Sequence, residues 1–146
     1  MKNLLRTIAV IPPLVLLTML GCTQNDSLPP ATTHDEPEPI ARTEFTDRIE
    51  NFFEYEPLHA GKPSQFRIHL TDLSDGSPVE KAEVSLSVRR ATERANVVST
   101  VAKVGKVTGI YVAELTIPQP GNYDVEFHIR NAKLDERLSL SDFKVE

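Results

Sequence analysis

Asn122-Tyr-Asp-Val-Glu-Phe-His-Ile-Arg130 is the stretch of sequence that decides the fold. Apolar and polar residues alternate through it, and one face collects the apolar side chains: Tyr123, Val125, Phe127 and Ile129. A period of two residues is the signature of a β-strand that buries one of its faces. The stretch therefore predicts a strand packed against a core.

The same alternation recurs through the second half of the chain. Residues 65–71 and 83–89 show it clearly, and it is weaker in four other segments: residues 52–55, 97–104, 109–117 and 138–145. Pro, Gly and Asp turns separate these segments, and no helical stripe follows residue 49. About seven short strands in this space predict an all-β fold, an immunoglobulin-like β-sandwich over residues 45–146. Tyr123 follows a Pro-Gly turn, where such domains often place a corner tyrosine bonded back to the backbone.

The N-terminus carries a targeting signal. Residues 1–21 have a short basic start and an apolar run, which predicts a secretory signal peptide. The apolar run is too short for a comfortable transmembrane helix, which needs about 20 residues. Met19-Leu20-Gly21-Cys22 resembles the lipobox of bacterial lipoproteins.

That resemblance implies that the thiol of Cys22 receives a diacylglycerol, and that its new amino group receives an acyl chain such as palmitate. Several acyl chains together anchor a protein firmly to a membrane. Thr23 follows the Cys in place of Asp, which by the sorting rule of that family favours the outer membrane, with the protein on its periplasmic side. The alternatives are an ordinary cleaved signal peptide and an uncleaved anchor with an incidental Cys.

Residues 22–44 predict a flexible tether behind the lipidated Cys22. They hold four Pro, several acidic residues and almost no large apolar side chains. Such a segment cannot bury enough surface to offset its ordering entropy.

Composition and motifs exclude several classes of function. A formal charge of −5 is unfavourable for binding nucleic acid, and a single Cys excludes an intrachain disulfide or a Cys-based zinc site. No Gly-x-Ser-x-Gly elbow is present, and Asp72 and Asp75 fit a hairpin turn better than a calcium loop. We expect no enzyme activity and no cofactor beyond the lipid on Cys22.

Histidines are the candidate metal ligands. His69 and His128 fall on the polar side of their predicted strands, and they could bind copper or zinc if those strands lie in one sheet. His59, in a loop, could join such a set. The alternative is that these histidines are exposed polar side chains without a ligand. Removal of the signal peptide and lipidation of Cys22 would leave no Met and no free thiol, which argues against a methionine-based copper site.

Residues 53–79, with Pro-Leu-His-Ala-Gly, Leu-Thr-Asp-Leu and Pro-Val, form a recognisable module with Gly109-Ile110-Tyr111 and the Pro-Gln-Pro-Gly-Asn-Tyr segment ending at Tyr123. This module resembles the N-terminal β-sandwich of periplasmic adaptor (membrane fusion) proteins of heavy-metal-type RND efflux systems. The resemblance covers residues 44–146. Those adaptors continue into further domains, so it implies a free-standing accessory or a shortened adaptor, with RND components as partners.

Three functions follow from the sequence. The first is a non-enzymatic, membrane-anchored accessory of an efflux or envelope transport system, which acts by protein contact through a sheet edge or loops. The second is a periplasmic copper- or zinc-binding protein that uses His59, His69 or His128. The third is a structural or adhesive module that binds polymers. The sequence leaves the oligomeric state open.

Overall fold

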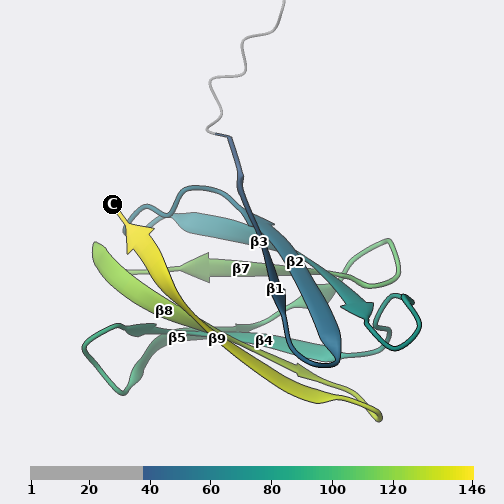
Figure 1. Cartoon of the computed structure of the whole chain (residues 1–146). Coiled ribbons are helices and arrows are strands. Elements are labelled where there is room, and N and C mark those ends of the chain that lie inside the picture. Colours follow the sequence, from purple (N-terminus) through teal and green to yellow (C-terminus); the bar gives the residue numbers. More distant parts are fainter. Residues whose placement is uncertain (1–37) are drawn as a thin grey trace, which may run out of the picture. The chain divides into compact units, whose positions relative to one another are not determined.

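Nine strands and no helix make up residues 38–146, the part of the chain that the computed structural model describes (Figure 1). In chain order they are β1 (Ile40–Phe45), β2 (Ile49–Tyr55), β3 (Pro63–Asp72), β4 (Glu83–Arg90), β5 (Asn96–Val101), β6 (Lys103–Val104), β7 (Ile110–Thr116), β8 (Gly121–Arg130) and β9 (Asp135–Val145). The predicted signal peptide, Cys22 and the tether up to residue 37 lie outside the described residues. Within the described range, no helix is long and apolar enough to span a membrane.

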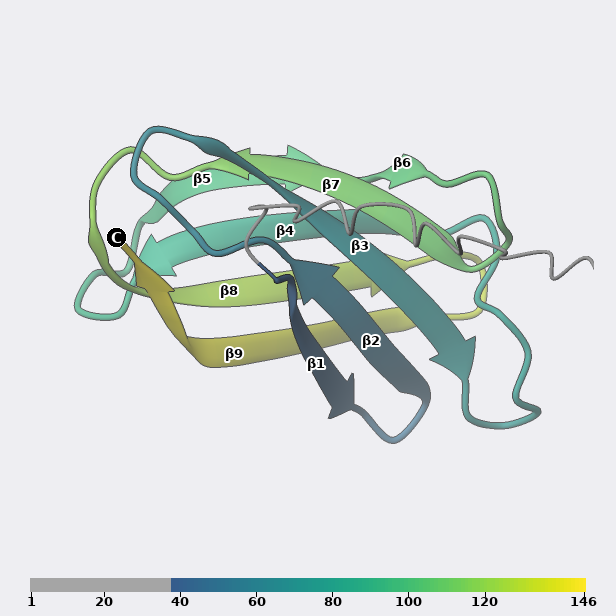
Figure 2. The same ribbon diagram turned by 90° about the horizontal axis from the view of Figure 1, so that it is seen from above.

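The strands form two antiparallel sheets. One sheet has the order β1-β2-β3-β7-β6 and the other the order β5-β4-β8-β9. Figures 1 and 2 show the two sheets as layers that face each other. The predicted all-β sandwich is therefore confirmed.

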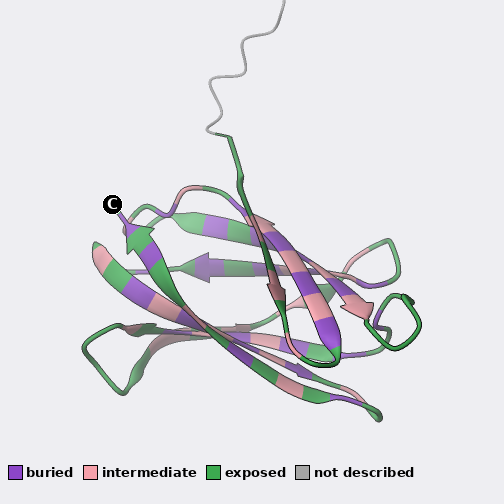
Figure 3. Cartoon of the chain, viewed as in Figure 1, coloured by how far each residue is buried: buried purple, intermediate pink, exposed green. Residues whose placement is uncertain are grey.

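The core lies between the sheets and is built by alternation along each strand. In β8 the buried residues are the four that the sequence places on the apolar face, and β2 alternates in the same way (Figure 3). Aromatic rings fill the centre, where Phe53 lies 4.8 Å from Phe127 and Tyr55 stacks on Phe66 at 5.0 Å between ring centroids. Asn51 is also fully buried, and neither polar atom of its side chain has a hydrogen-bond partner among the described residues.

The two halves of the quoted module contact each other inside this fold. Gly109 has φ +80°, and a Cβ there would lie 2.6 Å from the Cβ of Pro78, so only glycine fits without a shift. Two residues later, the buried hydroxyl of Tyr111 donates to the carbonyl of Val79 at 2.8 Å and accepts from the amide of Ala82 at 3.1 Å. This tyrosine thereby fixes the segment through which the chain crosses from one sheet to the other.

Tyr123 forms the predicted tyrosine corner. Its ring is fully buried, and its hydroxyl donates to the backbone carbonyl of Gln119 at 2.9 Å. The prediction from the Pro-Gly turn is confirmed.

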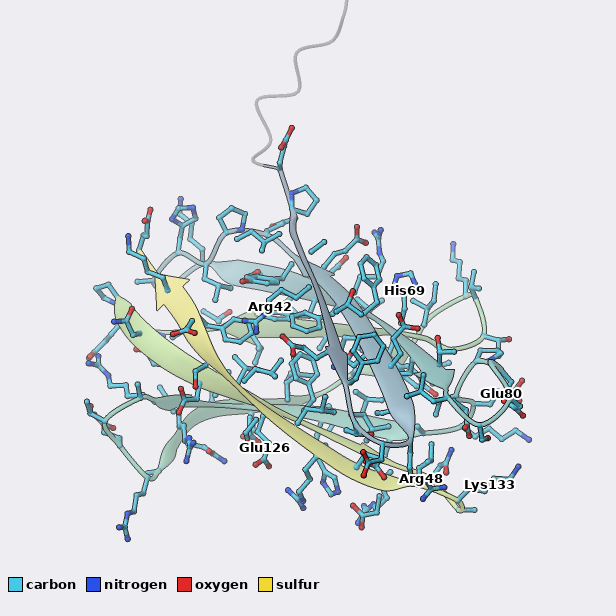
Figure 4. The ribbon with its side chains drawn as sticks, viewed as in Figure 1. Arg42, Arg48, His69, Glu80, Glu126 and Lys133 are labelled. Carbon is cyan, nitrogen blue, oxygen red and sulfur yellow. The ribbon has the colours of Figure 1, made fainter. Side chains whose placement is uncertain are left out.

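The predicted end of the tether is wrong by several residues. Residues 40–44 were expected to be flexible, yet they pair with β2 in register from Ile40 opposite Tyr55 to Phe45 opposite Glu50. No residue of β1 belongs to the buried core, which is why a composition argument misses this strand. Backbone pairing holds it, and the Arg42 side chain reaches between the sheets (Figure 4).

The segment predicted as one strand over residues 97–104 divides into β5 and β6, which belong to different sheets. The amide of Ala102 still donates to Val84 of β4 at 2.7 Å, and the chain then passes to β7. This switch makes β5 and β6 neighbours along one side of the sandwich. Strands β1 and β9 form the opposite side, where Arg42 of β1 donates to the carbonyl of Ser141.

Candidate interaction surface

The outer face of the four-stranded sheet is covered by ion pairs. Its outward side chains alternate in charge across neighbouring strands, with four pairs: Arg89–Asp124 at 3.1 Å, His128–Asp135 at 2.7 Å, Arg130–Glu83 at 2.7 Å and Arg137–Glu126 at 2.8 Å. Ser87 and Ser99 extend this polar surface through a hydrogen bond between their hydroxyls at 3.0 Å. A surface whose charges satisfy one another is a solvated face, and it offers little apolar area to a partner.

The outer face of the five-stranded sheet is different. Phe52 of β2, His69 of β3 and Ile110 of β7 lie side by side across the three neighbouring strands. Phe45 on β1 is 62% exposed, and Val112 continues the outward side of β7. We call Phe45, Phe52, His69, Ile110 and Val112 the apolar face.

Within the apolar face the rings of Phe52 and His69 meet edge to face, with their centroids 5.3 Å apart. His69 is half-buried, and its Nε2 has no hydrogen-bond partner among the described residues. A buried polar atom without a partner costs free energy that an apolar side chain would not. The imidazole therefore belongs to an aromatic surface and leaves one ring nitrogen without a hydrogen-bond partner among the described residues.

The charges around the apolar face have both signs. Arg67 approaches Glu54 at 3.8 Å, with the arginine side chain more than half exposed. Glu50 and Glu114 also lie on outward positions of β2 and β7, and neither has an ion pair among residues 38–146. Lys103 of β6 lies opposite Val112, so the rim carries charges of both signs, which favours a protein patch of mixed character.

The three candidate metal ligands do not come together. His69 lies on β3 in the five-stranded sheet, whereas His128 lies on β8 in the other, so the condition for a joint site is not met. Figure 4 shows His69 on the upper side of the molecule, whereas Glu126, on β8 with His128, lies below it. His59 is exposed in the loop after β2. No group of three or more His, Cys, Asp or Glu within the described residues has the geometry to hold a metal ion.

His128 has a partner of a different kind. Its Nε2 lies 2.7 Å from Oδ1 of Asp135, across the β8–β9 hairpin. This hydrogen bond is the main cause that lowers the pKa of the Asp135 carboxyl. The pair forms one element of the ion-paired face, so in the present arrangement His128 is already engaged.

Asp72 and Asp75 form turns, as expected from the sequence. Oδ1 of Asp72 accepts hydrogen bonds from the amide and hydroxyl of Ser74, and Oδ1 of Asp75 accepts from the amide of Ser77. These bonds lower the pKa of both carboxyls. The expected hairpin is only local, because the chain then crosses to the other sheet at β4.

A shallow cavity of about 340 Å³ lies beside these turns. Asp72, Glu80, Lys81 and Lys133 line it together with backbone of the β8–β9 turn, and Arg48 donates to the carbonyl of Lys133 at 2.8 Å. Charges of both signs share a hollow that is open to solvent, so it shows no preference for one class of ligand.

Sequence reasoning did not find the apolar face. Phe52 and Ile110 are apolar residues at outward positions of their strands, where the alternation predicts polar side chains. This departure from the pattern is the sequence signal by which the face could have been found. Phe45 joins the same face through β1, of which residues 40–44 had been predicted as tether.

Comparison with protein families assigns this sandwich to a family. The YtkA-like family model matches residues 46–128, more than half of the chain, and spans β2 to most of β8. The chain is a member of the YtkA-like family. This family is a group of small β-rich domains, which agrees with the two-sheet architecture. No curated protein and no solved structure matches the chain. The more specific resemblance to efflux adaptors stays a prediction.

Proposed function

We propose that this YtkA-like protein is a non-enzymatic, lipid-anchored accessory of a bacterial envelope transport or efflux system. In this proposal Cys22 holds the protein at the periplasmic side of a membrane, and the sandwich docks on a protein component of the system through the apolar face. The observation that carries the proposal is the contrast between the two outer faces. One is saturated with ion pairs, and the other exposes Phe45 beside the row of Phe52, His69 and Ile110.

The chemistry of the apolar face supports a protein as the partner. Aromatic side chains dominate the energetics of protein interfaces, and depletion of charge at the centre distinguishes an interface from ordinary surface. Glu50 and Glu114 would meet basic residues at the rim of the partner's patch, where charge governs specificity and association rate. The resemblance to the adaptor sandwich supplies the kind of system, by analogy of fold.

The test is site-specific photo-cross-linking of the full-length protein in native membranes. A photoreactive phenylalanine analogue replaces Phe52 in one variant and Ser87, on the ion-paired face, in a matched control. We expect the Phe52 variant to capture a pump, an adaptor or an outer-membrane channel, and the Ser87 variant not to. Equal capture from both positions, or no transport component from either, would overturn the proposal.

The metal-binding alternative has weaker support, because the candidate histidines lie apart. It predicts stoichiometric Cu(II) or Zn(II) binding that a triple His59→Ala, His69→Ala, His128→Ala variant loses. Unchanged affinity in that variant would end this alternative.

A further inference from the structure

The free edges of the two sheets differ in how they are protected. Strands β1, β6, β5 and β9 end the sheets, and an edge strand presents unpaired amides and carbonyls to any other extended chain. Proteins block such edges with inward charges, bulges or very short strands.

At three of the four edges these devices are pronounced. Strand β1 turns Arg42 and Glu44 towards the inside of the sandwich, and β6 is two residues long. Strand β9 shifts register against β8, and within it Asp142 has φ +71°. These features disfavour addition of another strand at those edges.

Strand β5 is the least protected: its register against β4 shifts only near its first residues, between Val88 and Arg89, and it pairs without interruption from Val98 to Val101. Its sequence, Asn-Val-Val-Ser-Thr-Val, holds no charge and no proline, and it is rich in β-branched residues. Val101 is 61% exposed, and beyond it Val104 and Val107 are 69% and 61% exposed. These three valines are half of the six large apolar residues that are exposed in the described part of the chain, which makes this side of the sandwich unusually apolar for a free edge.

The register shows which backbone groups of β5 are free. Ala102 lies opposite Val84 and donates to its carbonyl at 2.7 Å, and pairs bonded in this way alternate along an antiparallel ladder. The residues between them, Ser99 and Val101, therefore direct their amides and carbonyls away from β4 and towards the open edge. The edge is ready to accept a strand.

The charges beside this edge favour an acidic strand. Arg94 precedes β5 and lines a hollow with Asp124 and Glu126 on the ion-paired face. Lys103 lies on β6 opposite Val112, and Lys106 follows β6. None of the three cations has an ion pair within residues 38–146. A second copy of the chain, paired antiparallel along β5, would bring Arg94 of one copy towards Lys103 of the other. Like charges at such a contact are unfavourable, so the charge pattern argues against self-pairing.

We infer that β5 receives an extended, acidic segment of a partner protein, added as a further strand to the four-stranded sheet. In this mode the main chain supplies hydrogen bonds, and alternate side chains supply specificity. Apolar side chains of the added strand would contact Val101 and Val104, and its carboxylates would pair with the three cations. A lipid headgroup could meet the cations, but it could not satisfy the strand edge. This surface adjoins the apolar face at Lys103, which lies opposite Val112, but the strand edge of β5 belongs to the other sheet.

The probe is a fluorescent peptide of about eight residues that alternates Val and Glu, with a Val/Lys peptide as its control. Binding to the full-length protein in detergent is measured by anisotropy, together with amide hydrogen exchange. We expect the Val/Glu peptide to bind at least about tenfold more tightly than the Val/Lys peptide. It should also slow exchange at Ser99 and Val101.

Charge reversal gives a variant that keeps the fold. The triple variant Arg94→Glu, Lys103→Glu, Lys106→Glu should reverse the preference between the two peptides. The matched control, Lys62→Glu, Lys81→Glu, Lys133→Glu, changes the net charge equally at positions outside β5, β6 and the segments that flank them, and it should keep the original preference.

Two further variants test the backbone contact. Ser99→Pro removes an amide that faces the open edge, and Val101→Lys places a charge there while leaving the β4 ladder intact. Each should weaken Val/Glu binding about tenfold, and Val101→Lys decides the matter if Ser99→Pro fails to fold.

Several results would overturn the inference. The first is that the Val/Glu peptide does not bind, and the second is that both triple variants lose affinity for it equally. The third is that the peptide slows amide exchange only outside β5. The fourth is that the protein binds anionic vesicles as tightly as the peptide and that Val101→Lys does not change this vesicle binding. Self-association in sedimentation that Val101→Lys abolishes would assign the edge to a second copy instead. None of these results depends on the cross-linking from Phe52, so the two proposals fail separately.

Discussion

The guanidinium carbon of Arg42 lies 5.0 Å from the ring centroid of Phe143, so a cation of edge strand β1 covers an aromatic ring of β9 in the opposite sheet. The same side chain donates to the carbonyl of Ser141 at 3.2 Å and pairs with Glu44 at 2.7 Å. One arginine thus joins the two sheets where no apolar residue of β1 does.

Replacement of Arg42 by alanine should lower the free energy of unfolding by about 1–2 kcal/mol, because a partly buried cation–π contact and a hydrogen bond are lost together. The pKa of Tyr55, which burial raises and Arg42 partly lowers, should rise further. Urea denaturation and a tyrosine titration of the full chain measure both effects. Arg67→Ala, at a looser and more exposed pair, should stay within about 0.5 kcal/mol of the wild type. Equal effects of the two substitutions would contradict this prediction.

Asn51→Val should raise the free energy of unfolding by about 1 kcal/mol, since valine removes two buried polar atoms that have no partner and suits a strand. Chemical denaturation measures the change. Asn122→Val, at an exposed position of β8, serves as the control and should have little effect. A loss of stability at Asn51 would show that its amide is hydrogen-bonded in solution.

Tyr111→Phe should destabilise the domain more than Tyr123→Phe. The first substitution leaves the amide of Ala82 and the carbonyl of Val79 without their partner, at a cost of about 2–3 kcal/mol, whereas the second loses one hydrogen bond worth about 1 kcal/mol. Both rings stay buried, so each variant is the control for the other. The reverse order in thermal or urea unfolding would refute the role assigned to Tyr111.

Asp135 should make stability depend on pH in the acid range. The hydrogen bond from His128 lowers the folded-state pKa of Asp135 below its ordinary value of 3.8. The resulting stabilisation is complete above the unfolded-state pKa and is lost as the pH falls through the folded-state pKa. Asp135→Asn should therefore be less stable than the wild type at neutral pH and equal to it in strong acid. In His128→Gln, an NMR titration should find the Asp135 pKa closer to 3.8.

Most strands could be predicted because a half-buried strand requires apolar and polar residues to alternate along the sequence. The alternation in β3, β4 and β8 is reproduced by their burial, and the tyrosine corner followed from one turn. Strand β1 was not predicted, because Arg42 stabilises it through a contact with Phe143, about one hundred residues away in the sequence. Composition alone cannot contain that information.

The functional surfaces were less predictable than the strands. Whether His69 and His128 share a sheet depends on strand order, which alternation does not encode. The free edge of β5 is a property of the same order, since its uncharged sequence would suit a central strand equally well. To predict the apolar face, one would have to know which residues of β2 and β7 point outward and that β1 lies beside β2.

Strands β1 and β9 lie on one side of the sandwich and β5 and β6 on the other, so the width of the domain separates β5 from the point where the chain enters. The chain enters the described domain at β1, and the five-stranded sheet extends four inter-strand spacings from there to β6, or roughly 19 Å. A segment bound along β5 would thus lie at the margin of the domain opposite to β1, where the chain enters it. In the proposed membrane-anchored protein, the width of the sandwich would therefore add to the distance from the membrane at which the protein can bind another chain.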